Sequence, residues 1–366
     1  MSSAPRVLLL ARGHGFGHAA RDLRIVKAMR TLRPDVDIQV MASGSAAVYL
    51  ELYGETFADM GIGDHEDMSP AAGKRIWELM DRYDPFDLVI ADEVVWALSF
   101  CARRWRRRAI LLTDWFYSEL GAPESDPILD QAGEILLLDF SAAHPGPVGF
   151  TTPIQAFGPV VGDFGVDRAT ARAELGVAAS DTVAVLTVGG MTAMVDNAAI
   201  ADLTVRTWLA HSPPGHRLFV LAEPFCQVPA ERAADIVWAG FTAEPEKYYA
   251  AADLVVANAN GTVTCDLVWN RVPVLAMTHP AVSYPDSFGL RVKAMSEAGM
   301  TVHGEATAST SELWQLMNQA MRNDCRPDPA FEWATGDQVA RHLLARLDYM
   351  VAKSDSVAPA GSAQPA

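Results

Sequence analysis

Residues 7–21, VLLLARGHGFGHAAR, predict a buried strand, a glycine-rich turn and the start of a helix. The first five residues are all apolar, which is typical of a central strand in a parallel sheet covered on both faces. Gly13, Gly15 and Gly17 then allow a tight turn and let another molecule approach the backbone closely. The helix is expected over 19–32, because Pro34 disfavours helical conformation in the residue before it.

Two histidines, His14 and His18, lie within this turn. Imidazole changes protonation near neutral pH, and ligands of parallel sheets commonly bind where a strand gives way to a helix. The pattern therefore predicts acid–base chemistry, with His18 or His14 as the base. A dinucleotide-binding turn is the minority interpretation, because His18 stands where that fingerprint has Gly or Ala. The plainest alternative is a simple turn with solvated histidines.

The composition predicts a globular chain of two domains, since half of the 366 residues are hydrophobic. We expect neither a transmembrane segment nor a signal peptide. The four scattered cysteines form no CxxC pair, which is typical of reduced thiols in a cytoplasmic protein without a metal framework. The formal net charge of −16 argues against nucleic acid as a partner, although a small phosphorylated ligand needs only local donors.

One basic run, Arg103 to Arg108, departs from this acidic balance. It follows a predicted helix and is interpreted as the solvated, basic end of that helix. The alternative is a patch that contacts an anionic membrane surface or an anionic acceptor, so we expect at most peripheral membrane contact.

Strands and helices alternate through the chain in two successive sets, which predicts parallel sheets with helices on both faces. The first set has strands over 7–11, 37–42, 88–91, 109–112 and 135–138, and helices over 19–32, 46–53, 71–83 and 94–105. A segment rich in Gly and Pro, 157–163, separates the sets. The second set has strands over 182–188, 217–222, 235–239, 254–257 and 274–277, and helices over 167–175, 197–209, 248–252, 263–269, 290–298 and 311–321.

We therefore predict an α/β fold with one Rossmann-like, doubly wound domain over 1–160 and another over 164–335. A last helix is expected at 338–350, within a segment 336–352, and the residues 353–366, rich in Ser, Ala and Pro, are expected to form a disordered tail. Ligands of such sheets bind beyond the carboxyl ends of the strands, so the predicted site is the cleft between two facing domains.

Polar residues follow two strands of the first domain. Asp92 and Glu93 come directly after strand 88–91, and Asp114 and Trp115 follow strand 109–112. Because parallel strands share a carboxyl edge, Asp92 is expected near His18, where it would fix the tautomer and stabilise the imidazolium. The alternative role for Asp92 is to cap the helix predicted from residue 94. Asp114 and Trp115 are expected to line the side of the cleft formed by the first domain, called the acceptor side below because His18 would deprotonate an acceptor hydroxyl there.

Two polar turns of the second domain are candidates for binding an anion. One follows strand 254–257 and opens a helix, whose free N–H groups favour a diphosphate without a metal. The other is the Gly-rich turn after strand 182–188. Asp266, inside the helix 263–269, is a candidate acceptor of hydrogen bonds from ribose hydroxyls. The residues predicted to bind the phosphorylated ligand, called the donor side below, are Gly189, Gly190, Thr192, Asn258, Asn260, Gly261, Thr262, Thr264 and Asp266.

These motifs resemble the GT-B glycosyltransferases that use nucleotide-sugar donors, namely the UDP-glycosyltransferases and the N-acetylglucosaminyl transferases of peptidoglycan synthesis. The resemblance covers nearly the whole chain. Residues 13–18 with Arg21 are similar to the family's N-terminal glycine loop and its His, and Asp92 falls where plant-type members keep the Asp that pairs with that His. Residues 253–273 resemble the donor signature, with Asp266 at the ribose-binding position and Asn258 at a diphosphate-binding position. Asp286 stands near the place of the carboxylate that binds the sugar.

The resemblance implies an inverting, metal-independent transfer of a sugar from a nucleoside diphosphate, of the UDP type, to a hydroxyl of a small-molecule or lipid-linked acceptor. His18, or His14, would be the base, paired with Asp92. The nucleotide sugar is a co-substrate, and no resident cofactor is implied. The last helix is implied to cross back to the first domain. The acceptor side would comprise Gly15, Phe16, Gly17, Arg21, Asp114 and Trp115.

Two other functions are compatible with the same residues. A nucleotide-sugar 2-epimerase would need carboxylates near the donor sugar, and Asp92, Glu93 and Asp114 are available for that role. A non-catalytic auxiliary protein would keep the fold without turnover, although the presence of both His18 and Asp92 argues against it. The segments expected to shape the acceptor, 61–73 and 116–127, carry no readable pattern, and no oligomeric state is indicated.

Overall fold

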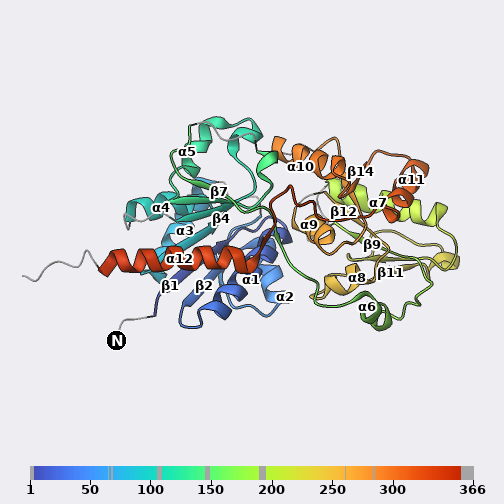
Figure 1. Ribbon diagram of the computed structural model, residues 1–366, viewed down its shortest axis with the longest axis horizontal. Helices are drawn as coiled ribbons and strands as arrows, with labels where there is room; N and C mark the ends of the chain where they lie inside the picture. Colours follow the sequence, from blue (N-terminus) through green and yellow to red (C-terminus); the bar gives the residue numbers. More distant parts are fainter. Residues whose placement is uncertain are drawn as a thin grey trace, which may run out of the picture.

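The computed structural model contains two parallel sheets, each covered by helices, that lie next to each other (Figure 1). It describes residues 4–64, 66, 69–104, 109–144, 149–188, 195–259, 261–282 and 285–355. The first sheet has the strand order β3-β2-β1-β4-β5-β6-β7, and the second has the order β11-β10-β9-β12-β13-β14. All of these pairings are parallel, so the predicted class of two doubly wound sheets is confirmed.

We call the first sheet with its helices the N-terminal unit. Its strands are β1 (Arg6–Ala11), β2 (Asp37–Ala42), β3 (Ala58–Asp59), β4 (Leu88–Asp92), β5 (Ile110–Thr113), β6 (Glu134–Leu137) and β7 (Ile154–Ala156). Its helices are α1 (Phe16–Leu32), α2 (Gly44–Leu52), α3 (Pro70–Tyr83), α4 (Trp96–Arg104) and α5 (Asp126–Leu129).

We call the second sheet with its helices the C-terminal unit. Its strands are β9 (Val183–Thr187), β10 (Arg217–Val220), β11 (Ile236–Trp238), β12 (Leu254–Asn258), β13 (Val274–Thr278) and β14 (Val302–Glu305). Its helices are α6 (Arg168–Glu174), α7 (Val195–His211), α8 (Pro245–Ala251), α9 (Thr262–Trp269), α10 (Asp286–Glu297) and α11 (Thr310–Met321).

Strand β1 is buried on both faces, as its apolar sequence predicts. Val7, Leu9 and Ala11 pack into the core that contains α1, while Leu8 and Leu10 pack into the core that contains α3 and α4. All five side chains are fully buried. The strand therefore places the turn that follows it at the middle of the sheet's carboxyl edge.

The turn after β1 depends on two of its glycines. A Cβ at Gly13 would lie 2.3 Å from the carbonyl oxygen of Ser43, so only glycine fits between the two backbones. Gly15 precedes helix α1 with φ of 75°, a conformation that L-residues rarely adopt. The helix starts at Phe16, three residues earlier than predicted, because this glycine turns the chain directly into it. His18 therefore lies in the first helical turn.

The last helix, α12 (Gly336–Asp355), returns to the N-terminal unit, and Figure 1 shows it running alongside α1. The chain crosses between the units through a short parallel pair, β8 (Val160–Val161) with β15 (Ala334–Thr335). Val339, Leu343 and Leu347 are fully buried in the same core as α1. The helix extends to Asp355, so the first residues of the predicted tail, 353–355, are helical, and 356–366 lie outside the described residues.

Several predicted boundaries are wrong by a few residues. Helix α4 begins at Trp96 rather than at residue 94, and α10 begins at Asp286 rather than at 290. Helix α11 is capped by Ser309, whose hydroxyl accepts the Glu312 N–H while the Glu312 carboxylate binds the Ser309 N–H. This reciprocal pair starts the helix at Thr310, one residue earlier than predicted. Strand β14 and the two short edge strands β3 and β7 had no apolar run that predicted them.

Among the described residues, no helix combines the length and the apolar character that crossing a membrane requires. Of the basic run at 103–108, Arg103 and Arg104 form the end of α4, as expected for a basic helix terminus, and the other four residues lie outside the described part of the chain.

Candidate active site

A cavity of about 590 Å³ lies between the two units, at the carboxyl ends of both sheets. Its volume is within the range of pockets that enclose small ligands. Both predicted sides of the cleft contribute to its walls. The acceptor-side residues that line it are His14, Gly15, Phe16, Gly17, His18, Arg21, Asp114 and Trp115, and the donor-side residues are Asn258, Gly261, Thr262 and Asp266.

The turn after β1 and the turn after β12 face each other directly. The Thr262 hydroxyl donates to the carbonyl oxygen of Gly17 at 3.3 Å, although the two residues are 245 positions apart. A Cβ at Gly17 would lie 3.2 Å from the Thr262 hydroxyl oxygen, so a larger residue would require the Thr262 side chain to shift. Two strand-to-helix turns from different sheets thus form one site.

His18, Asp92 and Arg21 form a buried hydrogen-bonded cluster at the N-terminal unit's side of the cavity. Nδ1 of His18 lies 3.1 Å from Oδ1 of Asp92, the last residue of β4. Nε of Arg21 donates to Oδ2 of Asp92 at 2.9 Å, and Nη2 of Arg21 also binds Oδ1. Asp92 is fully buried, and the His18 side chain is 11% exposed. The Asp92 carboxylate therefore binds side chains of α1 rather than capping α4.

The charges of this cluster shift the titration of both partners. Burial opposes ionisation of Asp92, but the nearby Arg21 and His18 hold its pKa well below its usual value. Burial lowers the pKa of His18, but Asp92 and Glu93 outweigh burial and Arg21 and leave that pKa raised. The pair therefore favours a carboxylate beside an imidazole that readily accepts a proton.

Glu93 occupies a strained position beside the same histidine. Its φ of 52° is in the left-handed region, which is uncommon for a residue with a side chain and is frequent at functional sites. The carboxylate accepts hydrogen bonds from Arg12 Nη1 (2.5 Å), the Trp115 indole N–H (2.7 Å) and the Asp114 backbone N–H (3.1 Å). It also lies 3.7 Å from Nε2 of His18.

Burial and the nearby Asp114 raise the pKa of Glu93, while three N–H donors favour its ionised form. The potential ligand atoms of His18, Asp92 and Glu93 all lie within 4.8 Å of one another, which is close enough to surround a cation. However, Arg12 and Arg21 already bind the two carboxylates, and a divalent cation there would face two guanidinium groups. We therefore assign no metal to this cluster.

Asp266 is held by a cation from the opposite unit. Arg24, on α1, donates to its two carboxylate oxygens at 3.0 and 2.7 Å. The Gly162 N–H adds a third hydrogen bond at 3.1 Å. Burial raises the pKa of Asp266, and Arg24 opposes that rise. Both side chains line the cavity, so the carboxylate predicted to bind a ribose is paired with Arg24.

Three solved structures resemble the chain over nearly its whole length. Arabidopsis thaliana UGT89C1 complexed with UDP has a TM-score of 0.62 and 13% identity, and the match covers 95% of this chain and 99% of that one. A UDP-glucosyltransferase from Polygonum tinctorium that glucosylates indoxyl has a TM-score of 0.60 and 11% identity, covering 98% and 95%. A Listeria monocytogenes protein assigned as a UDP-N-acetylglucosamine 2-epimerase has a TM-score of 0.58 and 14% identity, covering 97% and 98%.

The chain has the GT-B fold. No family model and no curated protein sequence matches it, so the likeness is one of architecture. The cavity described above is the cleft between the two halves of a GT-B protein.

Some donor-side residues predicted from the sequence lie away from this GT-B cleft. Thr264 is buried, and its hydroxyl donates to the carbonyl oxygen of Asn258 at 3.3 Å. It therefore stabilises the turn without lining the cavity. Asp286 is exposed in the first turn of α10 and is absent from the cavity wall, where Ser287 takes its place. The remaining predicted donor residues, Gly189, Gly190, Thr192 and Asn260, lie outside the described residues.

The GT-B cleft also contains residues that sequence reasoning missed. Arg12 and Arg24 bind the carboxylates of Glu93 and Asp266, but lone arginines carry no readable spacing. Phe241, 45% exposed after β11, lies 5.9 Å from the ring of Phe16 across the cleft. An aromatic residue after a strand of the second sheet was the available signal for this contact.

A second network closes one side of the cleft. Ser287, at the start of α10, donates to Glu119 at 2.7 Å, and Glu119 lies 2.7 Å from Nδ1 of His144. Arg291, on the same helix, donates to Asp139 at 2.7 Å. Burial lowers the pKa of His144, but the flanking Asp139 and Glu119 outweigh it and raise that pKa to about 9. These buried contacts hold α10 against the N-terminal unit.

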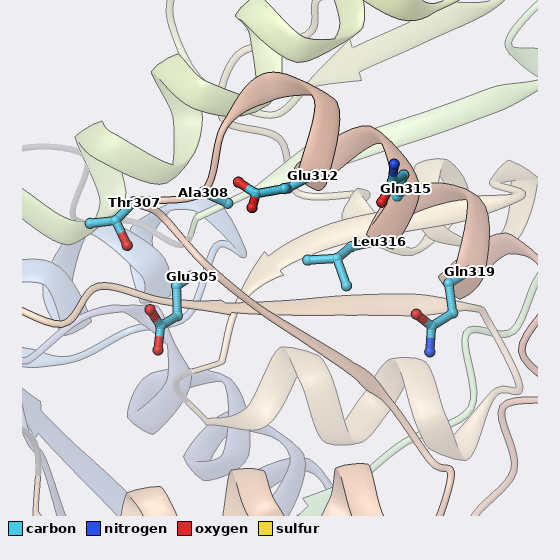
Figure 2. Close-up of a pocket in the computed structure, with 7 residues that line it drawn as sticks. All are labelled: Glu305, Thr307, Ala308, Glu312, Gln315, Leu316 and Gln319. Atoms are coloured by element: carbon cyan, nitrogen blue, oxygen red, sulfur yellow. The ribbon is translucent and has the colours of Figure 1, made fainter.

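A second cavity, of about 520 Å³, lies on the outer surface of the C-terminal unit (Figure 2). Figure 2 shows Glu305 on one side and Glu312, Gln315 and Gln319 along α11 on the other. Glu312 is already bound to the Ser309 cap of that helix. This cavity contains none of the strand-end residues of the GT-B cleft, and the candidate active site is therefore the first cavity.

Proposed function

We propose that this chain is a metal-independent, inverting glycosyltransferase that takes its sugar from a nucleoside diphosphate, most simply UDP. The observation that carries the proposal is the buried contact of 3.1 Å between Nδ1 of His18 and Asp92 in the cleft. Nδ1 also lies 2.9 Å from Nη2 of Arg21, so it faces the buried cluster, and Nε2 is the nitrogen proposed as the base. The acceptor is a hydroxyl of a small molecule or of a lipid-linked molecule.

In the proposed reaction, Nε2 of His18 takes the proton of the acceptor hydroxyl. The oxygen forms a bond to the anomeric carbon as the bond between that carbon and the diphosphate oxygen breaks, and the diphosphate leaves with the electron pair. One displacement at one carbon inverts its configuration. Asp92 stabilises the imidazolium and fixes its tautomer, a role of the kind that contributes about 10²–10⁴-fold to rate. His14, which also lines the cleft, is the second candidate for the base.

The donor is proposed to bind at the turn after β12. Helix α9 begins there at Thr262, and its unpaired N–H groups favour the diphosphate. Asp266 is proposed to accept hydrogen bonds from the ribose, which requires Arg24 to release at least one carboxylate oxygen. Asn258, which donates to Asn197 in the structure, is a further candidate for the phosphates. Gly189, Gly190, Thr192 and Asn260 stay predicted donor contacts.

A nucleotide-sugar 2-epimerase is the second candidate. The specific observation in its favour is the Glu93 carboxylate, 3.7 Å from Nε2 of His18, with a pKa raised by burial and Asp114. A carboxyl that titrates nearer neutral pH is suited to proton transfer at a sugar carbon. This reaction needs the nucleotide sugar alone, whereas glycosyl transfer needs an acceptor.

The test is release of nucleoside diphosphate from UDP-, TDP- and GDP-sugars, with phenolic and lipid-linked alcohols offered as acceptors. If His18 is the base, His18→Ala should lower kcat by about 10²–10⁴-fold and His14→Ala should change it far less, whereas the reverse order would assign the base to His14. If turnover survives in His18→Ala, the assignment of the base is wrong. Proton NMR of the nucleotide sugar without acceptor separates the alternatives, because only an epimerase inverts C2.

A further inference from the structure

Asp22, on α1 next to Arg21, is a buried carboxyl group that the proposed mechanism does not use. It is 1% exposed. Neither of its oxygens receives a hydrogen bond from a donor in the described part of the chain. An ionised carboxylate that is buried without donors is very costly, whereas the neutral acid needs only one acceptor. The environment of Asp22 therefore favours its protonated form.

The acceptor available to such an acid is Asp92. Both carboxyl groups are buried around Arg21, which comes directly before Asp22 in α1 and binds Asp92. Burial, followed by the charge of Asp92, raises the pKa of Asp22 well above its usual value. Oδ1 of Asp92 is used by His18 and Arg21, but Oδ2 accepts only one described hydrogen bond, from Nε of Arg21. Oδ2 therefore has room for a second donor.

The charge balance of the cluster points the same way. Asp92, Glu93 and Asp114 face two guanidinium groups, those of Arg12 and Arg21, which leaves one excess negative charge while the histidine is neutral. Protonation of the histidine removes that excess. A further ionised carboxylate at the position next to Arg21 would leave a buried negative charge uncompensated throughout.

We propose that Asp22 is held protonated and donates its O–H to Asp92, so that His18 is backed by two carboxyl groups in series rather than by one. Asp22 is then a positioning residue for the proposed glycosyl transfer, and the inference rests on that proposed function only for its link to catalysis. Its O–H withdraws negative charge from Asp92 and limits how strongly Asp92 attracts a proton to His18.

The charged groups that act on the two titrating side chains lie at the end of β4 and on α1. Asp92 and Glu93, at the end of β4, raise the pKa of Asp22 and of His18, while Arg21 on α1 lowers both. Asp114 acts on this cluster through its ion pair with Arg21. Removing the Asp22 proton donor leaves these charges in place and makes Asp92 a stronger acceptor.

The first experiment measures the protonation of Asp22 in the native protein. Carboxyl ¹³C NMR of the full chain is recorded against pH, and the Asp22 signal is identified by its absence in Asp22→Asn. The proposal expects this carboxyl to remain protonated at about pH 7, far above the ordinary aspartate pKa of about 3.9. Titration with a midpoint near that ordinary value overturns it.

The second experiment measures the pKa of His18 by imidazole NMR in two variants. Asp22→Asn keeps an N–H donor for Asp92 and should leave the pKa of His18 nearly unchanged. Asp22→Leu removes the donor and should raise that pKa by about half a unit to one unit, less than the one to three units that a full neighbouring charge gives. A purely structural role predicts no shift in either variant, and that result overturns the proposal.

Thermal unfolding gives an independent readout that needs no substrate. A carboxyl whose pKa is raised in the folded state contributes stability below its unfolded pKa and loses it as pH rises toward the folded pKa. The Tm of the native protein should therefore fall relative to Asp22→Asn between about pH 5 and about pH 8. A constant difference overturns the proposal. If these measurements give the expected results for Asp22 but no nucleotide sugar is turned over, the proposed function is wrong and the protonation of Asp22 stands.

Discussion

Replacing Arg24 by alanine removes the ion pair that joins α1 of the N-terminal unit to α9 of the C-terminal unit. The guanidinium donates two hydrogen bonds to Asp266 and one to the Val160 carbonyl oxygen at 3.0 Å. In the variant, the N–H of Gly162 is the one described hydrogen bond left to the Asp266 carboxylate. Asp266 is 5% exposed, so the variant leaves a nearly buried charge without its cation.

The expected loss of unfolding free energy is about 2 kcal/mol at neutral pH. Removing one partner of a fully buried ion pair costs about 3–5 kcal/mol. Here the Arg24 side chain is 25% exposed, so water already screens part of the interaction. The retained bond from Gly162 also stabilises the carboxylate, and both effects place the loss below that range.

The loss should grow as pH rises. Burial raises the pKa of Asp266 in the native protein, and Arg24 opposes that rise, so the variant has a higher folded pKa still. A carboxyl with a raised folded pKa contributes stability below its unfolded pKa and loses it as pH increases to the folded value. The additional loss is at most about 1.4 kcal/mol per pH unit over that window.

Urea unfolding at about pH 5 and about pH 8 measures both effects. Asp266→Asn is the matched control, because an amide has nearly the same shape and does not ionise. In that background, Arg24→Ala should cost less than about 1 kcal/mol at either pH. An equal loss in both backgrounds, or a loss that does not change with pH, would refute the role assigned to this ion pair.

Three further predictions concern the base, the turn and the last helix. Asp92→Asn should lower the pKa of His18, which moves the acidic limb of the pH–rate profile to lower pH, and should lower kcat by about 10²-fold or more; an unmoved limb contradicts the pairing. Gly13→Ala should lower the unfolding free energy by about 1–3 kcal/mol in urea titrations, because its Cβ would meet the Ser43 carbonyl oxygen, and an unchanged midpoint would show that the turn can relax. Leu343→Ala should cost about 2–5 kcal/mol by the same assay, whereas a loss below about 1 kcal/mol would mean that α12 contributes little to the core.

The sequence predicted the architecture because its buried strands are short apolar runs with distinct polar ends. Val7 to Ala11 is predicted as a central strand and Leu254 to Ala257 as a strand, and both lie in the interior of their sheets. The proximity of His18 and Asp92 followed from topology, since neighbouring parallel strands share one edge. Strand β14 was missed because its residues, VHGE, alternate too weakly to differ from a loop.

Contacts between the two units were beyond sequence reasoning. Arg24 looked like one more polar residue on an amphipathic helix, and only the fold brings it to Asp266, 242 positions away. The sequence did not indicate that Asp22 is buried, because an aspartate on a helix is usually exposed and no neighbouring residue distinguishes the two cases. Turn chemistry and resemblance predict Thr264 and Asp286 on the side that binds the nucleotide sugar. In the structure the Thr264 hydroxyl binds the Asn258 carbonyl oxygen, and Asp286 is exposed at the start of α10, outside the cavity wall.

Calorimetric titration with UDP, TDP and GDP tests most directly whether the cleft binds a nucleoside diphosphate. The account predicts saturable binding of at least one of them, close to native affinity in His18→Ala and weakened about tenfold or more in Asp266→Asn, which corresponds to about 1.4 kcal/mol. Absence of binding for all three, or equal binding by the native protein and Asp266→Asn, would contradict it.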